Sequence, residues 1–475
     1  MTTPGTDQEF MQRSQLALGL LLALGLTLRF VLGWYQSEDL LADNDGYLAH
    51  ARPVAAGAGF HGPYTNRPTA FRPPAYPVVL GGLMACGFSD PVAVAIVSFV
   101  SCVVIFLLTR TLALQVGMDQ RWSLLGVLAV ILDPLLLRYS ILPMTEVPCA
   151  AILLAAVVAF DKFRTSGVAS DRYSMWHGIL AGFLFGIGTL IRPVVMIVCV
   201  FVTLYALLCH LKAKHSGPAR LAAAESAATP AMMAASTNVL RGLFRLLIPA
   251  IVAGLVLCPW VIRNAVQFHH FIPATTHGGY TLALGNNPDF YRDVINGADE
   301  FPWDGRGLDS WQKRMIRDSE SEGIIATNEP AADAWYYSRA IATIRAEPKS
   351  FLRASALRLR RFWAISTADS SAVSARSMSF MMVWYVLLWT GLILQITQVC
   401  LGKRSPQHRS MAMLWLIIFA FLAMHTVYWT DTRMRAPLMP IMIIISLSGW
   451  QIASTCLSVR FFKRQKDDHS EHLRT

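Results

Sequence analysis

The order of apolar and polar stretches along the chain predicts a bundle of membrane-spanning helices. Apolar runs recur throughout, and most approach the length of about 20 residues that a helix needs to cross a hydrocarbon core. The candidate spans are residues 16–34, 90–113, 122–142, 147–161, 176–192, 193–211, 246–266, 378–399, 410–430 and 434–458. The third span contains Asp133 and Pro134 and the fourth is short, so their patterns are the weakest. Residues 75–88 are shorter and interrupted by proline and glycine, which favours a half-buried or interfacial segment.

Basic residues between the spans predict the orientation of the bundle. They gather in alternate short loops and in the C-terminal tail, at Lys162, Arg164, Arg172, Lys212, Lys214, Arg220, Lys403, Arg404, Arg409, Arg460, Lys463, Arg464 and Lys466. Because cytoplasmic loops are enriched in lysine and arginine, this pattern places both termini in the cytoplasm. The segment 267–377 is also basic, but long loops cross the membrane largely regardless of charge. It is therefore expected to face the periplasm.

The predicted topology divides the chain into three parts. They are an N-terminal transmembrane module at 1–266, with a periplasmic first loop at 35–75 and a cytoplasmic linker at 212–245, then a periplasmic domain at 267–377, and C-terminal transmembrane helices with a basic tail at 378–475. The periplasmic domain mixes turn-rich stretches such as NNPDF with the helical pattern AEPKSFLRASALRLRRFW. The predicted fold class is an all-α polytopic membrane protein with about ten spans and a mixed periplasmic domain.

Composition supports a membrane protein and argues against other classes of protein. The chain is 54% hydrophobic and only 15% charged, whereas soluble domains are about 25% charged. The net charge of +11 could suggest nucleic acid, but the loop asymmetry explains much of it more simply, and no nucleic-acid partner is expected. The eight cysteines lie in apolar segments without a CxxC pair, so neither a disulfide framework nor a zinc site is implied.

Ionisable residues gather at the predicted periplasmic ends of the spans. They include Asp43, Asp45, Arg67, Arg72, Arg138, Glu146, Arg192, Arg263, Asp431, Arg433 and Arg435. Charged groups at membrane depth usually face a protein interior or an aqueous cavity. Arginines bind phosphate, and a nearby carboxylate can take the proton of an attacking hydroxyl. Because the chain has no GxxxxGK[ST] or GxGxxG loop for a nucleotide, a phosphate-bearing substrate is expected to arrive tethered to a lipid.

A series of short motifs resembles a known family. The acidic first loop LADNDGYLAHA is followed by FRPPAYPVVL, ILDPLLLRYSILPMTE, GTLIRPVV, PWVIRNAVQFHHFIP, LALGNNP and RMRAPLMP. In this order they resemble bacterial polyprenyl-phosphate-dependent glycosyltransferases of the GT-C superfamily, in its protein O-mannosyltransferase-like and aminoarabinose transferase-like branches. The resemblance covers roughly residues 15–450, and it rests on the order of the motifs, because each one alone is weak.

The resemblance implies roles for several residues. An aspartate of the first outer loop serves this family as catalytic base or anchors the reacting hydroxyl. Asp43 is the first candidate because its spacing to Tyr47 is similar to that of the family, and Asp45 is the second. Arg72 matches the basic residue that holds the lipid phosphate, although the aminoarabinose branch has lysine there. Further substrate-binding residues implied by the motifs are Tyr47, Glu146, Arg192, Arg263 and Arg435.

The expected activity is a membrane glycosyltransferase, hexosyl or pentosyl, in a bacterial inner membrane. It would move a sugar from a polyprenyl-phosphate donor to a lipid, glycan or protein acceptor on the periplasmic side, with inversion. An acceptor that is an ionised phosphate would need no base. No cofactor is expected, and a divalent metal at the acidic pair stays open.

Three alternatives also remain. In the first, the aspartates serve solely to cap a helix and have no catalytic role. In the second, the chain is a transporter or flippase of lipid-linked sugars, and in the third it is a polysaccharide polymerase or ligase. A polymerase or ligase would use a lipid-pyrophosphate donor in place of the polyprenyl phosphate. The absence of obvious internal repeats and of a midplane polar cluster counts against a transporter.

Overall fold

The computed structural model describes residues 4–63, 67–166, 172–215, 229–297, 303, 306–325, 327–366, 374–400 and 408–472. Within these ranges the chain is helical with connecting loops and contains no strand, only an isolated bridge between His61 and Pro68. The predicted all-α class is therefore confirmed.

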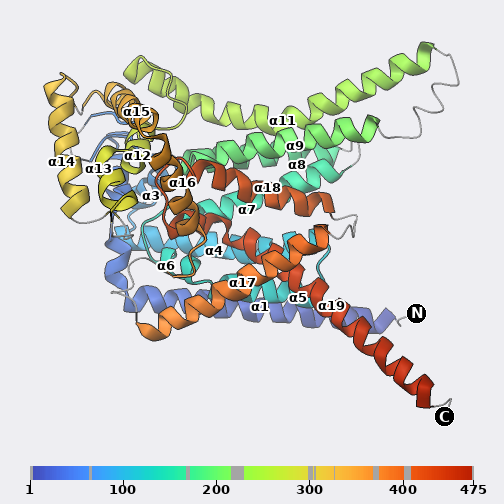
Figure 1. The fold of residues 1–475 in the computed structure, drawn as a ribbon. Helices are drawn as coiled ribbons and strands as arrows, with labels where there is room; N and C mark the ends of the chain where they lie inside the picture. The colour runs from blue at the N-terminus through green and yellow to red at the C-terminus, as the bar shows by residue number, and fades with distance from the viewer. Residues whose placement is uncertain are drawn as a thin grey trace.

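The long helices run side by side along one direction, as Figure 1 shows. They are α1 (Pro4–Tyr35), α4 (Asp90–Gln115), α5 (Gln120–Leu132), α7 (Glu146–Thr165), α8 (Arg172–Ile191), α9 (Val194–His215), α11 (Thr229–Phe268), α17 (Ala375–Cys400), α18 (His408–His425) and α19 (Met439–His472). Both termini lie at one end of this bundle. The predicted linker at 212–245 is partly helical, because residues 229–245 belong to α11, and residues 216–228 lie outside the described part.

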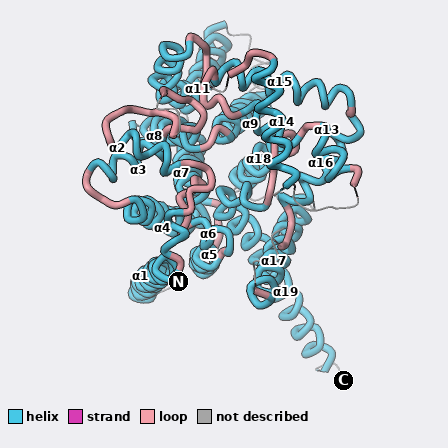
Figure 2. Tube along the Cα trace, turned by 90° about the vertical axis from the view of Figure 1, so that its left-hand side faces the viewer, coloured by secondary structure: helices cyan, strands magenta, loops and turns pink. Residues whose placement is uncertain are grey.

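Shorter helices and loops gather at the end of the bundle opposite the termini (Figures 1 and 2). They are η1 (Ser37–Leu41), α2 (Tyr47–Ala55), α3 (Ala75–Ala85), α6 (Pro134–Tyr139), α12 (Gly278–Gly285), α13 (Pro288–Phe290), η2 (Tyr291–Ile295), α14 (Arg306–Ser321), α15 (Glu329–Ala346), α16 (Pro348–Phe362) and η4 (Thr432–Leu438). The helix predicted from AEPKSFLRASALRLRRFW is α16. The turn-rich NNPDF forms the short helix α13, so the described part of 267–377 is helices and loops.

Seven helices of the described chain are long and apolar enough to cross a membrane. They coincide with the predicted spans at 16–34, 90–113, 176–192, 193–211, 246–266, 378–399 and 434–458. The predicted count of ten is not confirmed. Residues 410–430 contain only a shorter apolar helix, and residues 147–161 lie in α7, which is not among the seven.

The predicted span at 122–142 breaks where its sequence pattern was weakest. Asp133 ends α5 and begins α6, its carboxylate accepting the Leu136 backbone N–H at 3.0 Å, and Pro134 occupies the first turn of α6. Proline lacks the N–H that would continue α5 and is favoured at a helix start. A single apolar run therefore becomes two short helices. Residues 75–88, predicted to be half-buried or interfacial, form the short apolar helix α3.

The hydrophobic core lies around α7 and α19. Helix α7 packs against α4 and α8, and α19 packs against α17 and α5. Fifteen of the 20 residues of α7 are buried, among them Phe160 and Phe163, which fits a helix that is apolar on most of its circumference. Helix α1 is the opposite case, with its apolar residues Leu16, Leu20 and Leu24 exposed, as expected of a helix that faces lipid. The buried α7 begins at Glu146, which brings a carboxylate to the loop end of the core.

Candidate active site

The first loop turns sharply before α2, and Asp43 stabilises that turn. Gly46 has φ of 76°, a left-handed conformation that glycine adopts without strain, and α2 begins at the next residue. The Asp43 carboxylate accepts the backbone N–H of Leu48 at 3.0 Å and that of Ala49 at 2.8 Å. These are donors that a helix N-terminus leaves without partners. Asp43 therefore caps α2 with both of its oxygens.

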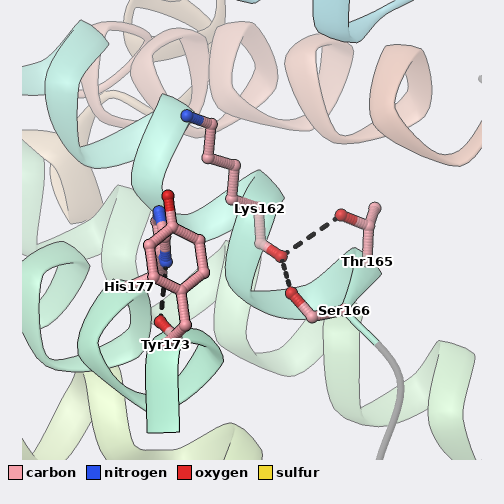
Figure 3. Close-up of a pocket in the computed structure, with 5 residues that line it drawn as sticks. All are labelled: Lys162, Thr165, Ser166, Tyr173 and His177. Atoms are coloured by element: carbon pink, nitrogen blue, oxygen red, sulfur yellow. Dashed lines mark hydrogen bonds between the residues drawn. The ribbon is translucent and has the colours of Figure 1, made fainter. Parts of the chain in front are cut away.

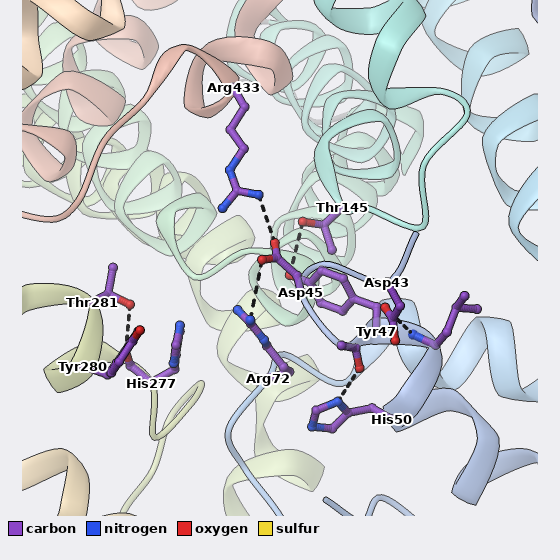
Figure 4. Close-up of polar contacts among 12 residues, drawn as sticks. Asp43, Asp45, Tyr47, His50, Arg72, Thr145, His277, Tyr280, Thr281 and Arg433 are labelled. Atoms are coloured by element: carbon purple, nitrogen blue, oxygen red, sulfur yellow. Dashed lines mark hydrogen bonds and ion pairs between the residues drawn. The ribbon is translucent and has the colours of Figure 1, made fainter. Parts of the chain in front are cut away.

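Asp45 occupies a different environment, between two arginines (Figure 4). Its Oδ1 lies 3.7 Å from Nη2 of Arg72, and its Oδ2 accepts a hydrogen bond from Nη1 of Arg433 at 3.2 Å. The three side chains are 21%, 17% and 24% exposed, respectively, so substrate or water can reach them. One carboxylate and two guanidinium groups thus meet at the loop end of the bundle. The sequence places Asp43 first as catalytic candidate, whereas in the structure Asp45 is the aspartate that faces the two arginines.

Arg72 rests on aromatic rings and is otherwise weakly held. Its guanidinium carbon lies 5.5 Å from the centre of the Tyr47 ring and 5.4 Å from that of Phe71. Its Nε is buried without a hydrogen-bond partner in the described chain. The Tyr47 hydroxyl lies 3.5 Å from the Thr145 hydroxyl, and burial raises the pKa of Tyr47, an effect that nearby Arg72 partly offsets. A guanidinium with free N–H groups over a phenol is a suitable anion ligand.

A second ion pair joins the start of α7 to the end of α8. Nη1 of Arg192 lies 3.0 Å from Oε1 of Glu146, which is 1% exposed, and Oε2 of Glu146 has no hydrogen-bond partner among the described residues. Nη2 of Arg192 also contacts Sδ of Met434, the neighbour of Arg433. Because the pair is buried, removing one partner would leave an uncompensated charge. It therefore supports the placement of η4 beside the first loop.

Two of the predicted substrate-binding arginines donate hydrogen bonds to backbone carbonyls. Arg263 donates to the Thr69 carbonyl at 2.7 Å and to the Phe60 carbonyl at 2.9 Å. Arg435 is 1% exposed and donates to the carbonyls of Phe362 at 2.6 Å and Ala364 at 2.7 Å. Its guanidinium also lies over the rings of Tyr385 and Trp389, at 4.2 and 5.2 Å. The structure thus brings Asp45, Tyr47 and Arg72 together, and it gives Arg263 and Arg435 backbone partners.

Arg433 and the aromatic pair of His277 and Tyr280 complete the cluster, and none of the three is among the residues that the sequence predicts to bind substrate. Arg433 stands two residues before Arg435 in RMRAP, so only the local fold of η4 distinguishes them. His277 lies 4.3 Å from Phe71 and stacks on Tyr280 at 5.1 Å (ring centroids). Figure 4 shows both on the side of Arg72 away from Tyr47. Burial is the main cause that lowers the pKa of His277 well below its ordinary value, and the positive charge of Arg72 lowers it further. This imidazole is therefore neutral near pH 7.

The sequence leaves a divalent metal at the acidic pair open. Within the described ranges, no three or more histidine, cysteine, aspartate or glutamate side chains are grouped so that they could hold an ion. The partners of Asp45 are cations, which suits a site that receives an anion.

A surface hollow at the other end of the bundle contains none of the predicted site residues. It is lined by Lys162, Thr165, Ser166, Tyr173 and His177 (Figure 3). The hydroxyls of Thr165 and Ser166 bond the Lys162 carbonyl and so close the end of α7. The side chains in this hollow mainly complete local helix ends.

Comparison with known proteins identifies the fold. No family model matches the chain, and no curated protein matches its sequence. The Archaeoglobus fulgidus oligosaccharyltransferase AglB, in complex with an inhibitory peptide and a dolichol-phosphate, matches with a TM-score of 0.53 and 12% identity over 95% of this chain and 52% of that chain. The same organism's oligosaccharyltransferase, tethered with an acceptor peptide, matches with a TM-score of 0.54 and 12% identity over 94% of this chain and 50% of that chain. This chain therefore spans about half the length of the oligosaccharyltransferase.

ArnT from Cupriavidus metallidurans bound to undecaprenyl phosphate also matches, with a TM-score of 0.40 and 13% identity over 90% of this chain and 77% of that chain. That score lies below the level of a shared fold. The similarity to the oligosaccharyltransferase establishes the fold: this polytopic helical membrane protein shares the fold of about half of that enzyme. The predicted resemblance is confirmed at the level of the fold.

Proposed function

We propose that this protein is a glycosyltransferase that moves a hexose or pentose from a polyprenyl-phosphate donor to an acceptor. The observation that carries the proposal is Asp45 between Arg72 and Arg433, at the loop end of a GT-C fold. A phosphate needs cationic ligands, and an attacking hydroxyl needs a base. This cluster supplies both within one set of contacts. A flippase would need the cations but no base.

The reaction follows from these groups. The acceptor hydroxyl attacks the anomeric carbon, its proton passes to the Asp45 carboxylate, and the bond from that carbon to the donor phosphate oxygen breaks. Arg72 and Arg433 stabilise the charge on the departing polyprenyl phosphate. A single displacement of this kind inverts the anomeric configuration. The acceptor is a lipid, a glycan or a protein with a free hydroxyl.

The donor is lipid-linked because of where the cluster lies. A polyprenyl tail fits a bundle whose outer helices expose apolar side chains, and the phosphate then rests at the ends of the spans. The oligosaccharyltransferase with this fold was solved with a dolichol-phosphate. We place the cluster, with residues 35–75 and 267–377, on the periplasmic side of a bacterial inner membrane, and residues 378–475 carry the last spans. In support, the termini lie at the opposite end from the cluster and the basic loops predict a cytoplasmic location for them.

The test is turnover of defined donors by the purified protein. Synthetic polyprenyl-phosphate hexoses and pentoses are supplied with lipid, glycan and peptide acceptors, and mass spectrometry follows released polyprenyl phosphate and glycosylated acceptor. We expect both products in equal amounts for one donor. A matched assay in liposomes measures movement of the same donor between leaflets. Movement without transfer would contradict the enzyme and favour a flippase, and turnover only of pyrophosphate donors would favour a polymerase or ligase.

A further inference from the structure

A glutamate far along the chain holds the loop that leads into Arg72. Glu329, in the first turn of α15, accepts a hydrogen bond from the Thr69 hydroxyl at 2.5 Å on Oε1. Its Oε2 accepts the backbone N–H of Ala70 at 2.8 Å and the hydroxyl of Thr276 at 2.8 Å. Both oxygens are thus occupied by donors from two other segments. One carboxylate ties α15 to the first loop and to the segment before α12.

The same loop is held from its other side by Arg263. This guanidinium donates to the Thr69 carbonyl, so Thr69 is fixed at its hydroxyl by an anion and at its carbonyl by a cation. The backbone N–H of Thr276 donates to the Ala70 carbonyl at 2.9 Å. Thr69 and Ala70 are 2% and 0% exposed, so water does not replace these bonds. Both carbonyls and the Ala70 N–H therefore have fixed partners.

Arg72 depends on this loop because its own side chain has few ties. Among the described residues it makes a long ion pair with Asp45, and its guanidinium lies near the rings of Tyr47 and Phe71. We infer that Glu329 is a positioning residue: it fixes the backbone at Thr69 and Ala70 so that Arg72 faces Asp45 and the donor phosphate. The inference rests on the proposed function for its ligand and on the described contacts for its geometry. Glu329 itself does not touch the reacting atoms.

The first experiment tests the geometry without any activity. Hydrogen exchange is measured on peptides that cover residues 69–72 in the wild type, in Glu329→Ala and in Glu347→Ala. Glu347 is the matched control, because within the described part of the chain its carboxylate accepts a hydrogen bond from the nearby Ser350 hydroxyl and from no residue of the first loop. We expect exchange at Ala70 and Phe71 to rise by about tenfold or more in Glu329→Ala, as for loss of one charge-assisted hydrogen bond, and to stay unchanged in Glu347→Ala. Unchanged exchange in both variants would overturn the inference.

The second experiment asks whether Glu329 acts through Arg72. Affinity for a synthetic polyprenyl-phosphate sugar is measured for Glu329→Ala, Arg72→Ala and the double variant. We expect about a tenfold weaker affinity in Glu329→Ala and no additional weakening when Arg72 is already absent. Independent, additive effects would show that Glu329 does not position Arg72. Glu329→Gln retains two acceptor contacts at most and should fall between the wild type and Glu329→Ala, with turnover of the bound donor close to wild type.

The outcomes separate the two proposals. Failure of the wild type to bind or turn over any polyprenyl-phosphate sugar would refute the proposed function, and the exchange result would still decide the role of Glu329. Normal donor affinity in Glu329→Ala, in a wild type that does turn over the donor, would refute the positioning role alone. A thermal melt of each variant is recorded beside these measurements. The two variants could show the same fall in melting temperature while hydrogen exchange at residues 69–72 rises only in Glu329→Ala. That result would still support the contact of Glu329 with Thr69 and Ala70.

Discussion

Replacing Asp45 by asparagine removes the proton acceptor and leaves the shape of the loop in place. The amide keeps an oxygen for Arg433 but cannot take the proton of the acceptor hydroxyl, and general-base catalysis is typically worth about 10²–10⁴-fold. We therefore expect transfer to a hydroxyl acceptor to fall by about 100-fold or more. Donor affinity should hold or improve, because the two arginines then face the phosphate without a competing carboxylate.

Asp43→Asn is the matched control, two residues away. Its two oxygens accept two backbone N–H groups, and an amide can replace only one of them, so the free energy of unfolding should fall by about 1 kcal/mol. Transfer should stay within a few-fold of the wild type. The assay is initial rate against donor concentration in detergent, with a thermal melt of each variant. The reasoning is refuted if Asp45→Asn retains full activity, or if Asp43→Asn alone abolishes it while its melting temperature is unchanged.

Three further predictions concern other parts of the cluster. Arg433→Met should weaken donor binding about tenfold or more at normal stability. Arg435→Met should lower the free energy of unfolding by about 3 kcal/mol, because it leaves the buried Phe362 carbonyl and the half-buried Ala364 carbonyl without their donor. Binding isotherms and urea melts check both variants, and the reverse pattern would exchange their roles. An impermeant thiol reagent should label a cysteine placed at Gly297 in intact spheroplasts and not one placed at Tyr173, and the opposite labelling would invert the topology. Because the pKa of His277 is lowered in the folded protein, the unfolded chain binds a proton on this imidazole more readily than the folded chain does. The free energy of unfolding should therefore decrease as pH falls below about 6.5, and His277→Phe should reduce that decrease. Identical profiles of stability against pH for the two proteins would contradict a neutral, buried His277.

Much of the fold could be predicted from hydropathy because long apolar helices leave a strong periodic signal. The exceptions have local causes. The run at 122–142 is divided by Asp133 and Pro134, and the stretch 147–161 belongs to a helix whose ends carry Glu146 and Lys162. Burial inside the bundle allows α7 to be less apolar at its ends than a helix that faces lipid. Hydropathy averaged over a sequence window does not distinguish an interrupted run or a buried helix from a helix that spans the membrane. The presence of spans is therefore more predictable than their number.

The candidate site was predictable as a place but not as a set of contacts. Asp45, Tyr47 and Arg72 come together from the first loop, as the motif order indicated. Glu146 pairs with Arg192, whereas the sequence predicts only that both lie at the same end of the bundle and bind substrate. The tie through Glu329 joins segments more than 250 residues apart and has no local sequence signal. Such a contact depends on the packing of α15 against the first loop, which a single sequence does not encode in any short pattern.

The structure gives different partners to the two members of two like-charged pairs, Asp43 with Asp45 and Arg433 with Arg435. In LADNDGY the left-handed Gly46 turns the chain so that the Asp43 carboxylate folds back onto α2, which leaves Asp45 facing outward to the arginines. In TRMRAP the 3₁₀ turns of η4 direct Arg435 to the carbonyls of Phe362 and Ala364 at the C-terminal end of α16, and they direct Arg433 to Asp45. In each pair one charge completes the local backbone and the other is left to the site. Charged pairs beside a tight turn should therefore be assigned by asking which member satisfies the nearby orphan backbone groups, because the other member is then the one available for chemistry.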